Sequence, residues 1–124
     1  MQNFPEEVLV VEDEALIRIE AADALADYGI MAWEAGDAEE ALVALEQHPR
    51  IGLIFTDVNM PGEMNGLDLA HEVSKVRPDV RLIVTSGAQT ISSEELPERG
   101  TFLAKPYATE YLIGIVSQKL DGEG

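Results

Sequence analysis

Short runs of apolar residues recur along the chain and do not alternate with polar residues. They are VLVV at 8–11, IMAW at 30–33, LIF at 53–55, LIV at 82–84 and FLA at 102–104. Unbroken apolarity is typical of strands that are covered on both faces, as in a parallel sheet. Because each run is short, a strand is favoured over a buried helix. The pattern therefore predicts five buried strands.

Between these runs, apolar residues recur at the three- and four-residue spacing of helices that bury one face. The segments with this spacing are 16–25, 38–45, 69–76 and 112–120. Asp37 can cap the start of the second segment, and Gly29 can end the first in a left-handed conformation. Strands thus alternate with helices, and the expected fold class is α/β.

The interval between the fourth and fifth runs, GAQTISSEELPERG at 87–100, breaks this rhythm. It offers only a short helix around Ser93 to Leu96, which Pro97 would end, and few apolar residues to anchor it. We expect a mobile segment with a short or irregular fourth helix. No repeat, low-complexity tract or internal linker divides the chain, so one domain over residues 1–124 is expected, with a frayed end at 121–124.

The charge of the chain argues against several classes of partner. Lys and Arg number 8 and Asp and Glu number 24, a formal net charge of −16 that opposes contact with phosphate backbones and anionic lipid. The start lacks the basic and apolar regions of a signal peptide, and no apolar run approaches the ~20 residues that span a bilayer. There is no cysteine for disulfides or metal ligation. We expect a soluble cytoplasmic protein that binds neither nucleic acid nor membrane.

Polar residues follow four of the apolar runs, at the strand ends where parallel sheets bind ligands. They are Glu12 and Asp13 after the first run, Asp57 after the third, Thr85 and Ser86 after the fourth, and Lys105 after the fifth. Converging carboxylates repel by about 1 to 4 kcal/mol per pair at close range, so a cation is expected among them. Oxygen ligands of this kind suit Mg²⁺. Lys105 and the Thr85 hydroxyl suit a phosphoryl oxygen.

The segments VLVVEDE, FTDVNMPG, VTSG and LAKPY, at these spacings, resemble the receiver domain of two-component response regulators, the CheY-like family. The resemblance covers nearly the whole chain and implies a flavodoxin-like, doubly wound parallel sheet of five strands in the order 2-1-3-4-5. The site residues that it implies are Asp57 as phosphoacceptor, Glu12, Asp13, Asp57 and the main chain of Asn59 as Mg²⁺ ligands, Thr85 and Lys105 as phosphate-binding catalytic groups, and Thr85 with Phe102 as the switch.

Three departures from the family pattern bear on output rather than on chemistry. GEMNG at 62–66 places one extra residue in the loop next to Asp57. The aromatic switch position is Phe102, where many relatives have tyrosine. The interval from Thr85 to Lys105 is short and contains Pro97, so a full fourth helix is not expected.

The resemblance implies a signalling switch and not an enzyme in the usual sense. A sensor histidine kinase or a histidine phosphotransfer protein would phosphorylate Asp57, and slow self-catalysed hydrolysis would reset a contact with an unknown downstream protein. Since the chain starts at Met1 and tapers into DGEG, we expect a stand-alone receiver without an output domain.

Two alternatives remain open. One is a Mg²⁺-dependent phosphohydrolase with an aspartyl-phosphate intermediate. It is disfavoured because haloacid-dehalogenase-like enzymes carry Asp-x-Asp after the first strand, where this chain has Glu12-Asp13. The other is a phosphorylation-independent interaction module, against which the joint presence of Asp13, Asp57 and Lys105 argues.

Overall fold

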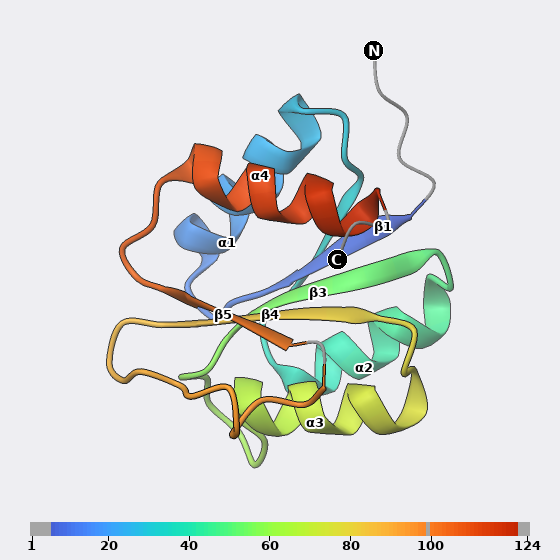
Figure 1. Cartoon of the computed structure of the whole chain (residues 1–124). Helices are drawn as coiled ribbons and strands as arrows, with labels where there is room; N and C mark the ends of the chain where they lie inside the picture. Colours follow the sequence, from blue (N-terminus) through green and yellow to red (C-terminus); the bar gives the residue numbers. More distant parts are fainter. Residues whose placement is uncertain (1–5, 99, 122–124) are drawn as a thin grey trace.

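Five parallel strands form one sheet with helices on both faces (Figure 1). The computed structural model describes residues 6–98 and 100–121. Its elements are β1 (Glu7–Val11), α1 (Ala15–Asp27), β2 (Ala32–Ala35), α2 (Ala38–Gln47), β3 (Ile51–Asp57), α3 (Gly66–Val76), β4 (Arg81–Ser86), β5 (Gly100–Ala104) and α4 (Thr109–Leu120). The strands pair in the order β2-β1-β3-β4-β5, which confirms the flavodoxin-like order. None of the described helices is long and apolar enough to cross a membrane.

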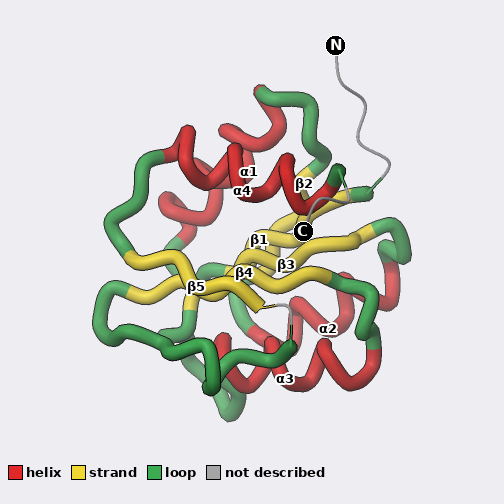
Figure 2. The backbone as a smooth tube through the Cα atoms, in the orientation of Figure 1, coloured by secondary structure: helices red, strands yellow, loops and turns green. Residues whose placement is uncertain are grey.

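The sheet separates two hydrophobic cores. Helices α1 and α4 cover one face and α2 and α3 the other (Figure 2). Successive residues of β3 point to opposite faces, so Leu53 and Phe55 belong to the α1/α4 core and Ile54 to the α2/α3 core. Because both faces are covered, all seven residues of β3 are buried. This double burial is the reason that the strands read as continuous apolar runs.

Helix ends follow the predicted local signals. The Asp37 side chain accepts a hydrogen bond from the N–H of Glu40 at 2.9 Å and caps α2. Gly29, with φ of 95°, follows α1 in the left-handed conformation. At the start of α3, Asn65 and Asp68 form a reciprocal capping box.

The second strand lies two residues later than its apolar run predicts. Ile30 is fully buried, but it belongs to the turn after α1, where its N–H donates to the carbonyl of Leu25 at 2.9 Å. Pairing with β1 runs from Ala32 to Ala35. An apolar run marks core residues, and it does not distinguish a strand from the turn that leads into it.

Between β4 and β5, the segment 87–98 contains a short turn at residues 93–95 instead of a helix and is otherwise irregular. The N–H and hydroxyl of Ser92 donate to Glu95 Oε2 at 3.0 and 3.1 Å, and the N–H of Glu95 donates to the carbonyl of Ser92. The bond from the Ser92 N–H to the Glu95 side chain is one half of the capping box that starts many helices, but Pro97 lacks the N–H of the next turn and disfavours helical backbone before it. The predicted short fourth helix is thus reduced to one turn, anchored by the buried Ile91 and Leu96. Its mobility stays a prediction.

Candidate functional site

Asp57 is the last residue of β3 and lies at the carboxyl edge of the sheet. It is 7% exposed and lies next to Thr85 of β4 in the strand register. The strand behind it is buried throughout, so its backbone is held on both sides by β1 and β4. The sequence prediction of a charge at the end of a core strand is therefore correct, and this carboxylate has only limited access to solvent.

Glu12, Asp13 and Asp57 form the predicted acidic cluster. Each offers a carboxylate oxygen, and these oxygens lie within 4.8 Å of one another. Glu12 and Asp57 are buried, while Asp13 is exposed. Burial raises the pKa of Glu12, and repulsion from Asp57 adds to this, although hydrogen bonds from the N–H of Glu14 and from Lys105 oppose it. The ionised form of Glu12 is thus disfavoured at this position.

Lys105 supplies the positive charge that the cluster contacts. Its Nζ lies 3.3 Å from Glu12 Oε1 and 3.4 Å from Asp57 Oδ2. Burial alone would lower the pKa of Lys105, but attraction to Asp57 and Glu12 outweighs it and raises the pKa above 10.5. The lysine is therefore charged at neutral pH and is poised beside the Asp57 carboxylate.

The buried hydroxyl of Thr85 accepts and donates no hydrogen bond among the described residues. It is 2% exposed, and its Oγ1 has no hydrogen-bond partner in the part of the chain that the structure describes. An orphaned buried hydroxyl next to Asp57 fits a group that awaits an acceptor. Phe102 is half-buried and packs against the α2/α3 core, and the register sets it beside Val84 rather than beside Thr85.

Asn59 and Ser86 connect the loops around Asp57. The N–H of Asn59 donates to Asp57 Oδ1 at 3.4 Å, so its main chain lies beside the cluster, while its role as an Mg²⁺ ligand stays a prediction. Its side chain donates to Ser86 Oγ at 3.3 Å, and that oxygen also accepts from the N–H groups of Ala88 and Gln89. The sequence identified Ser86 only as a polar residue at a strand end. Its role as a junction of two loops depends on tertiary contacts.

Gly62, in the loop after Asp57, has a left-handed backbone with φ of 104°. The end of this loop lies against the end of β3, where the N–H of Gly66 donates to the carbonyl of Val58 at 2.9 Å. A Cβ on Gly66 would collide with the carbonyl group of Asp57. Glycine is therefore required here by its close approach to the backbone of Asp57.

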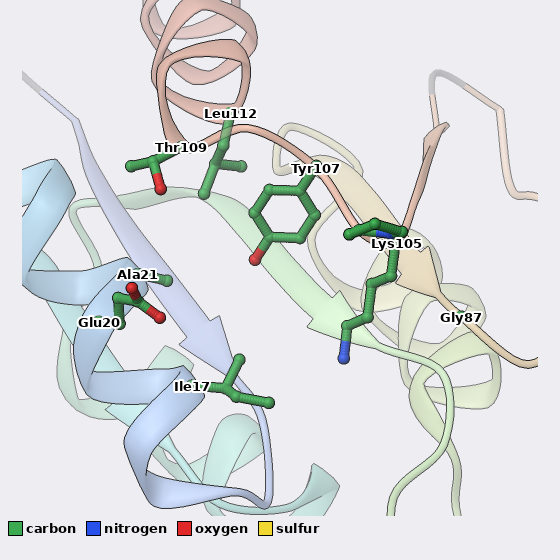
Figure 3. Close-up of a pocket in the computed structure, with 9 residues that line it drawn as sticks. Ile17, Glu20, Ala21, Gly87, Lys105, Tyr107, Thr109 and Leu112 are labelled. Carbon is green, nitrogen blue, oxygen red and sulfur yellow. The ribbon is translucent and has the colours of Figure 1, made fainter.

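A cavity of about 520 Å³ adjoins Lys105 between α1 and the loop that follows β5. Figure 3 shows the Tyr107 ring and the Lys105 side chain facing Ile17 and Glu20 of α1 across this space. Burial raises the pKa of Tyr107, whose ring packs edge-on against Phe55. The cavity gives the Lys105 side of the cluster an open approach from solvent.

The sheet order and the carboxylate cluster with its lysine define an α/β protein of the response-regulator type. The family model of the response regulator receiver domain matches residues 8–117, and the chain belongs to this family.

Relatives of known type agree with this assignment. The DNA-binding transcriptional regulator NtrC of Azospirillum brasilense is 38% identical over 92% of this chain, which spans 24% of NtrC. The chemotaxis protein CheY of Thermotoga maritima is 31% identical over 86% of this chain and 90% of its own length. The receiver domain from hybrid histidine kinase CckA superposes with a TM-score of 0.76 at 34% identity, covering 92% of this chain and 98% of that domain.

Proposed function

We propose that this chain is a phosphoacceptor receiver that takes a phosphoryl group onto Asp57 from a phosphohistidine of a sensor histidine kinase or a histidine phosphotransfer protein. One observation carries the proposal. The Asp57 carboxylate stands at the end of a buried strand, with Lys105 Nζ at 3.4 Å and the carboxylates of Glu12 and Asp13 beside it. A carboxylate held still in this way, beside a lysine, is suited to act as a nucleophile toward phosphorus.

The transfer exchanges one bond for another. An oxygen of Asp57 attacks the phosphorus, an O–P bond forms, and the P–N bond to the donor imidazole breaks, with its electron pair returning to the nitrogen. Lys105 then exchanges part of its contact with Asp57 for a phosphoryl oxygen. The free hydroxyl of Thr85 donates to a second oxygen and so gains the partner that it lacks.

The donor set fits Mg²⁺. Three carboxylates within 4.8 Å offer only oxygen ligands, and a single lysine does not balance their charge. Glu12, Asp13, Asp57 and the main-chain carbonyl of Asn59 would hold the ion. When bound, Mg²⁺ supplies positive charge against the oxygens of the transferring group.

The proposed role is that of a switch rather than a turnover enzyme. Slow loss of the phosphoryl group would reset it, and the change would be read by a downstream protein. A kinase-type donor is supported by the similarity to the receiver of CckA. The strongly negative charge opposes direct binding to nucleic acid, and we place the protein in the cytoplasm, where such donors act.

The test is labelling by acetyl phosphate, a small phosphodonor. In the presence of Mg²⁺ the intact chain should gain one phosphoryl mass, and either EDTA or Asp57→Ala should abolish the gain. Asp79→Asn, which changes a carboxylate far from the cluster at the other end of the sheet, should label as the wild type does. Peptide mapping of the phosphate to any residue other than Asp57 would refute the assignment.

The alternatives give different results in the same experiment. Sustained release of many equivalents of phosphate from varied phosphomonoesters would indicate a phosphohydrolase. Absence of labelling from both acetyl phosphate and phosphohistidine donors would indicate an interaction module that works without phosphorylation.

A further inference from the structure

Arg18 contacts the main chain of Glu12, a residue of the acidic cluster, and has no part in the proposed phosphoryl transfer. It lies on α1 and its side chain is 21% exposed. Its Nη1 donates to the main-chain carbonyl of Glu12 at 2.9 Å, and its Nε donates to Glu34 Oε1 at 3.1 Å. The guanidinium thus joins α1, the end of β1 and the edge strand β2 at one point.

The contact with the Glu12 carbonyl fixes the peptide that leads into Asp13. The N–H of Glu12 already donates to the carbonyl of Ala35 at 3.0 Å, so the peptide on its other side is held by the sheet. Because peptide groups are planar, holding the planes on both sides of Glu12 fixes its backbone dihedrals. Arg18 thus helps to hold the peptide from which Asp13 follows.

The side chain of Glu12 is held separately. Its Oε2 accepts from the N–H of Glu14 at 3.1 Å, and its Oε1 accepts from Lys105. These bonds orient the Glu12 carboxylate, and the one from Glu14 closes a ring across the Glu12–Asp13 peptide. They do not bind the carbonyl of that peptide, which Arg18 holds. Mg²⁺ demands near-ideal octahedral geometry, so a small rotation of this peptide matters more for Mg²⁺ than for a tolerant cation such as Ca²⁺.

We propose that Arg18 is a positioning residue that presents Asp13 and Glu12 in the geometry that Mg²⁺ requires. The inference rests on the proposed function, since it takes Mg²⁺ as the ion of this cluster. It leads to a counterintuitive sign. Removal of a positive charge near three carboxylates should strengthen cation binding by simple electrostatics, whereas loss of positioning should weaken it.

The experiment is calorimetric titration of the full chain with MgCl₂ and, separately, with CaCl₂. Arg18→Met keeps much of the aliphatic stem and removes the guanidinium. We expect its dissociation constant for Mg²⁺ to rise by about tenfold or more, with a smaller rise for Ca²⁺. Arg18→Lys keeps the charge but replaces the two nitrogens that bond Glu34 and Glu12 with a single ammonium of different reach, so it should also bind Mg²⁺ more weakly than the wild type.

Arg77→Met is the matched control. Arg77 makes the same kind of bridge at the opposite end of the sheet, donating to the carbonyl of Ile51 at 3.2 Å and to Asp79 at 3.1 Å. The Arg77→Met substitution should lower the unfolding temperature without changing the affinity for Mg²⁺ or for Ca²⁺. A general loss of stability would therefore be distinguished from loss of positioning.

The outcomes separate the two proposals. If the wild type binds Mg²⁺ and Arg18→Met binds it equally or more tightly, the positioning role is wrong while the proposed function stands. If Arg18→Met does not fold, the test rests on Arg18→Lys. If Arg18→Lys then binds Mg²⁺ with the dissociation constant of the wild type, Arg18 acts only through its charge and the inference also fails. If the wild type does not bind Mg²⁺ at all, both the metal in the proposed function and this inference fall.

Discussion

At the scale of single residues, Glu12 illustrates how the site is destabilised before any ligand binds. Its folded-state pKa lies above the ordinary value of 4.5, chiefly because of burial. The folded protein therefore holds the proton more tightly than the unfolded chain does. It follows that ionisation of Glu12 lowers stability as the pH rises through the raised pKa, and that acidification toward 4.5 restores it.

Glu12→Gln should remove this pH dependence in the metal-free protein. We expect the free energy of unfolding of the variant, relative to the wild type, to fall as the pH is lowered from 7 to 4.5, because only the wild type gains a proton on folding in that window. Denaturant unfolding in EDTA at several pH values measures the difference. If the stability of the variant relative to the wild type stays constant with pH, or rises as the pH falls, the raised pKa is wrong.

Gly66→Ala should damage the site through the backbone. The new Cβ would meet the carbonyl of Asp57 and lie 2.9 Å from Val58 Cα, and neither atom belongs to a flexible side chain. We expect a loss of about 1 to 3 kcal/mol in unfolding free energy and slower acetyl phosphate labelling.

Gly114→Ala on α4 is the control for this substitution. Beyond its chain neighbours and the backbone of its own helix, no atom of the described residues lies within 4 Å of the added Cβ, so alanine there should stabilise the helix by about 0.5 to 1 kcal/mol. Equal effects of the two substitutions would show that the close approach at Gly66 is unimportant.

At the scale of elements, the segment 87–98 is the part most suited to report phosphorylation. Ser86 Oγ holds its first residues, and the turn at Ser92 and Glu95 with the buried Ile91 and Leu96 holds its end. Between these anchors it has no regular structure. Phe102 is already half-buried against the α2/α3 core, so it has little distance to move when Thr85 turns toward a phosphoryl group.

We therefore expect phosphorylation to order residues 87–98 with little movement of Phe102. Amide exchange should slow across this segment when beryllofluoride, a mimic of the phosphoryl group, is added to the wild type with Mg²⁺. Thr85→Ala should still be phosphorylated on Asp57 but should not show the added protection, because the hydroxyl that links the two is gone. Unchanged exchange in the wild type, or equal slowing in Thr85→Ala, would exclude this mechanism.

At the scale of the whole molecule, the main feature is negative charge. The chain has a net charge of −16, and three of its carboxylates, those of Glu12, Asp13 and Asp57, lie close together at one edge of the sheet. Mg²⁺ at tenfold its dissociation constant should raise the free energy of unfolding by about 1.4 kcal/mol. Asp13→Asn should stabilise the metal-free protein by up to about 1 kcal/mol and reduce the gain from Mg²⁺.

Asp23→Asn is the control for Asp13→Asn, because it removes one negative charge from the exposed surface of α1. It should leave the response to Mg²⁺ unchanged, which separates local repulsion from the overall charge. Unfolding curves with and without MgCl₂ provide the measurement. Equal unfolding temperatures of the wild type at saturating Mg²⁺ and in EDTA would rule out a preformed site.

The local pattern of the sequence determined the α/β class, the helices, four of the five strand positions and the caps at Asp37 and Gly29. It also predicted that Glu12, Asp13, Asp57 and Lys105 would meet, because parallel strands bring their carboxyl ends to one edge. The strand order came from the family resemblance and was confirmed by the structure.

Tertiary structure alone decided the remaining features. The offset of β2, the bridge from Arg18 to Glu12 and Glu34, and the junction at Ser86 join residues whose contact depends on strand register and helix placement. The sequence shows Arg18 as one cation on a helix and Ser86 as one more hydroxyl. Hydrophobic periodicity reports which residues are buried, whereas a side-chain hydrogen bond depends on distances of a few tenths of an ångström that only the packed chain sets.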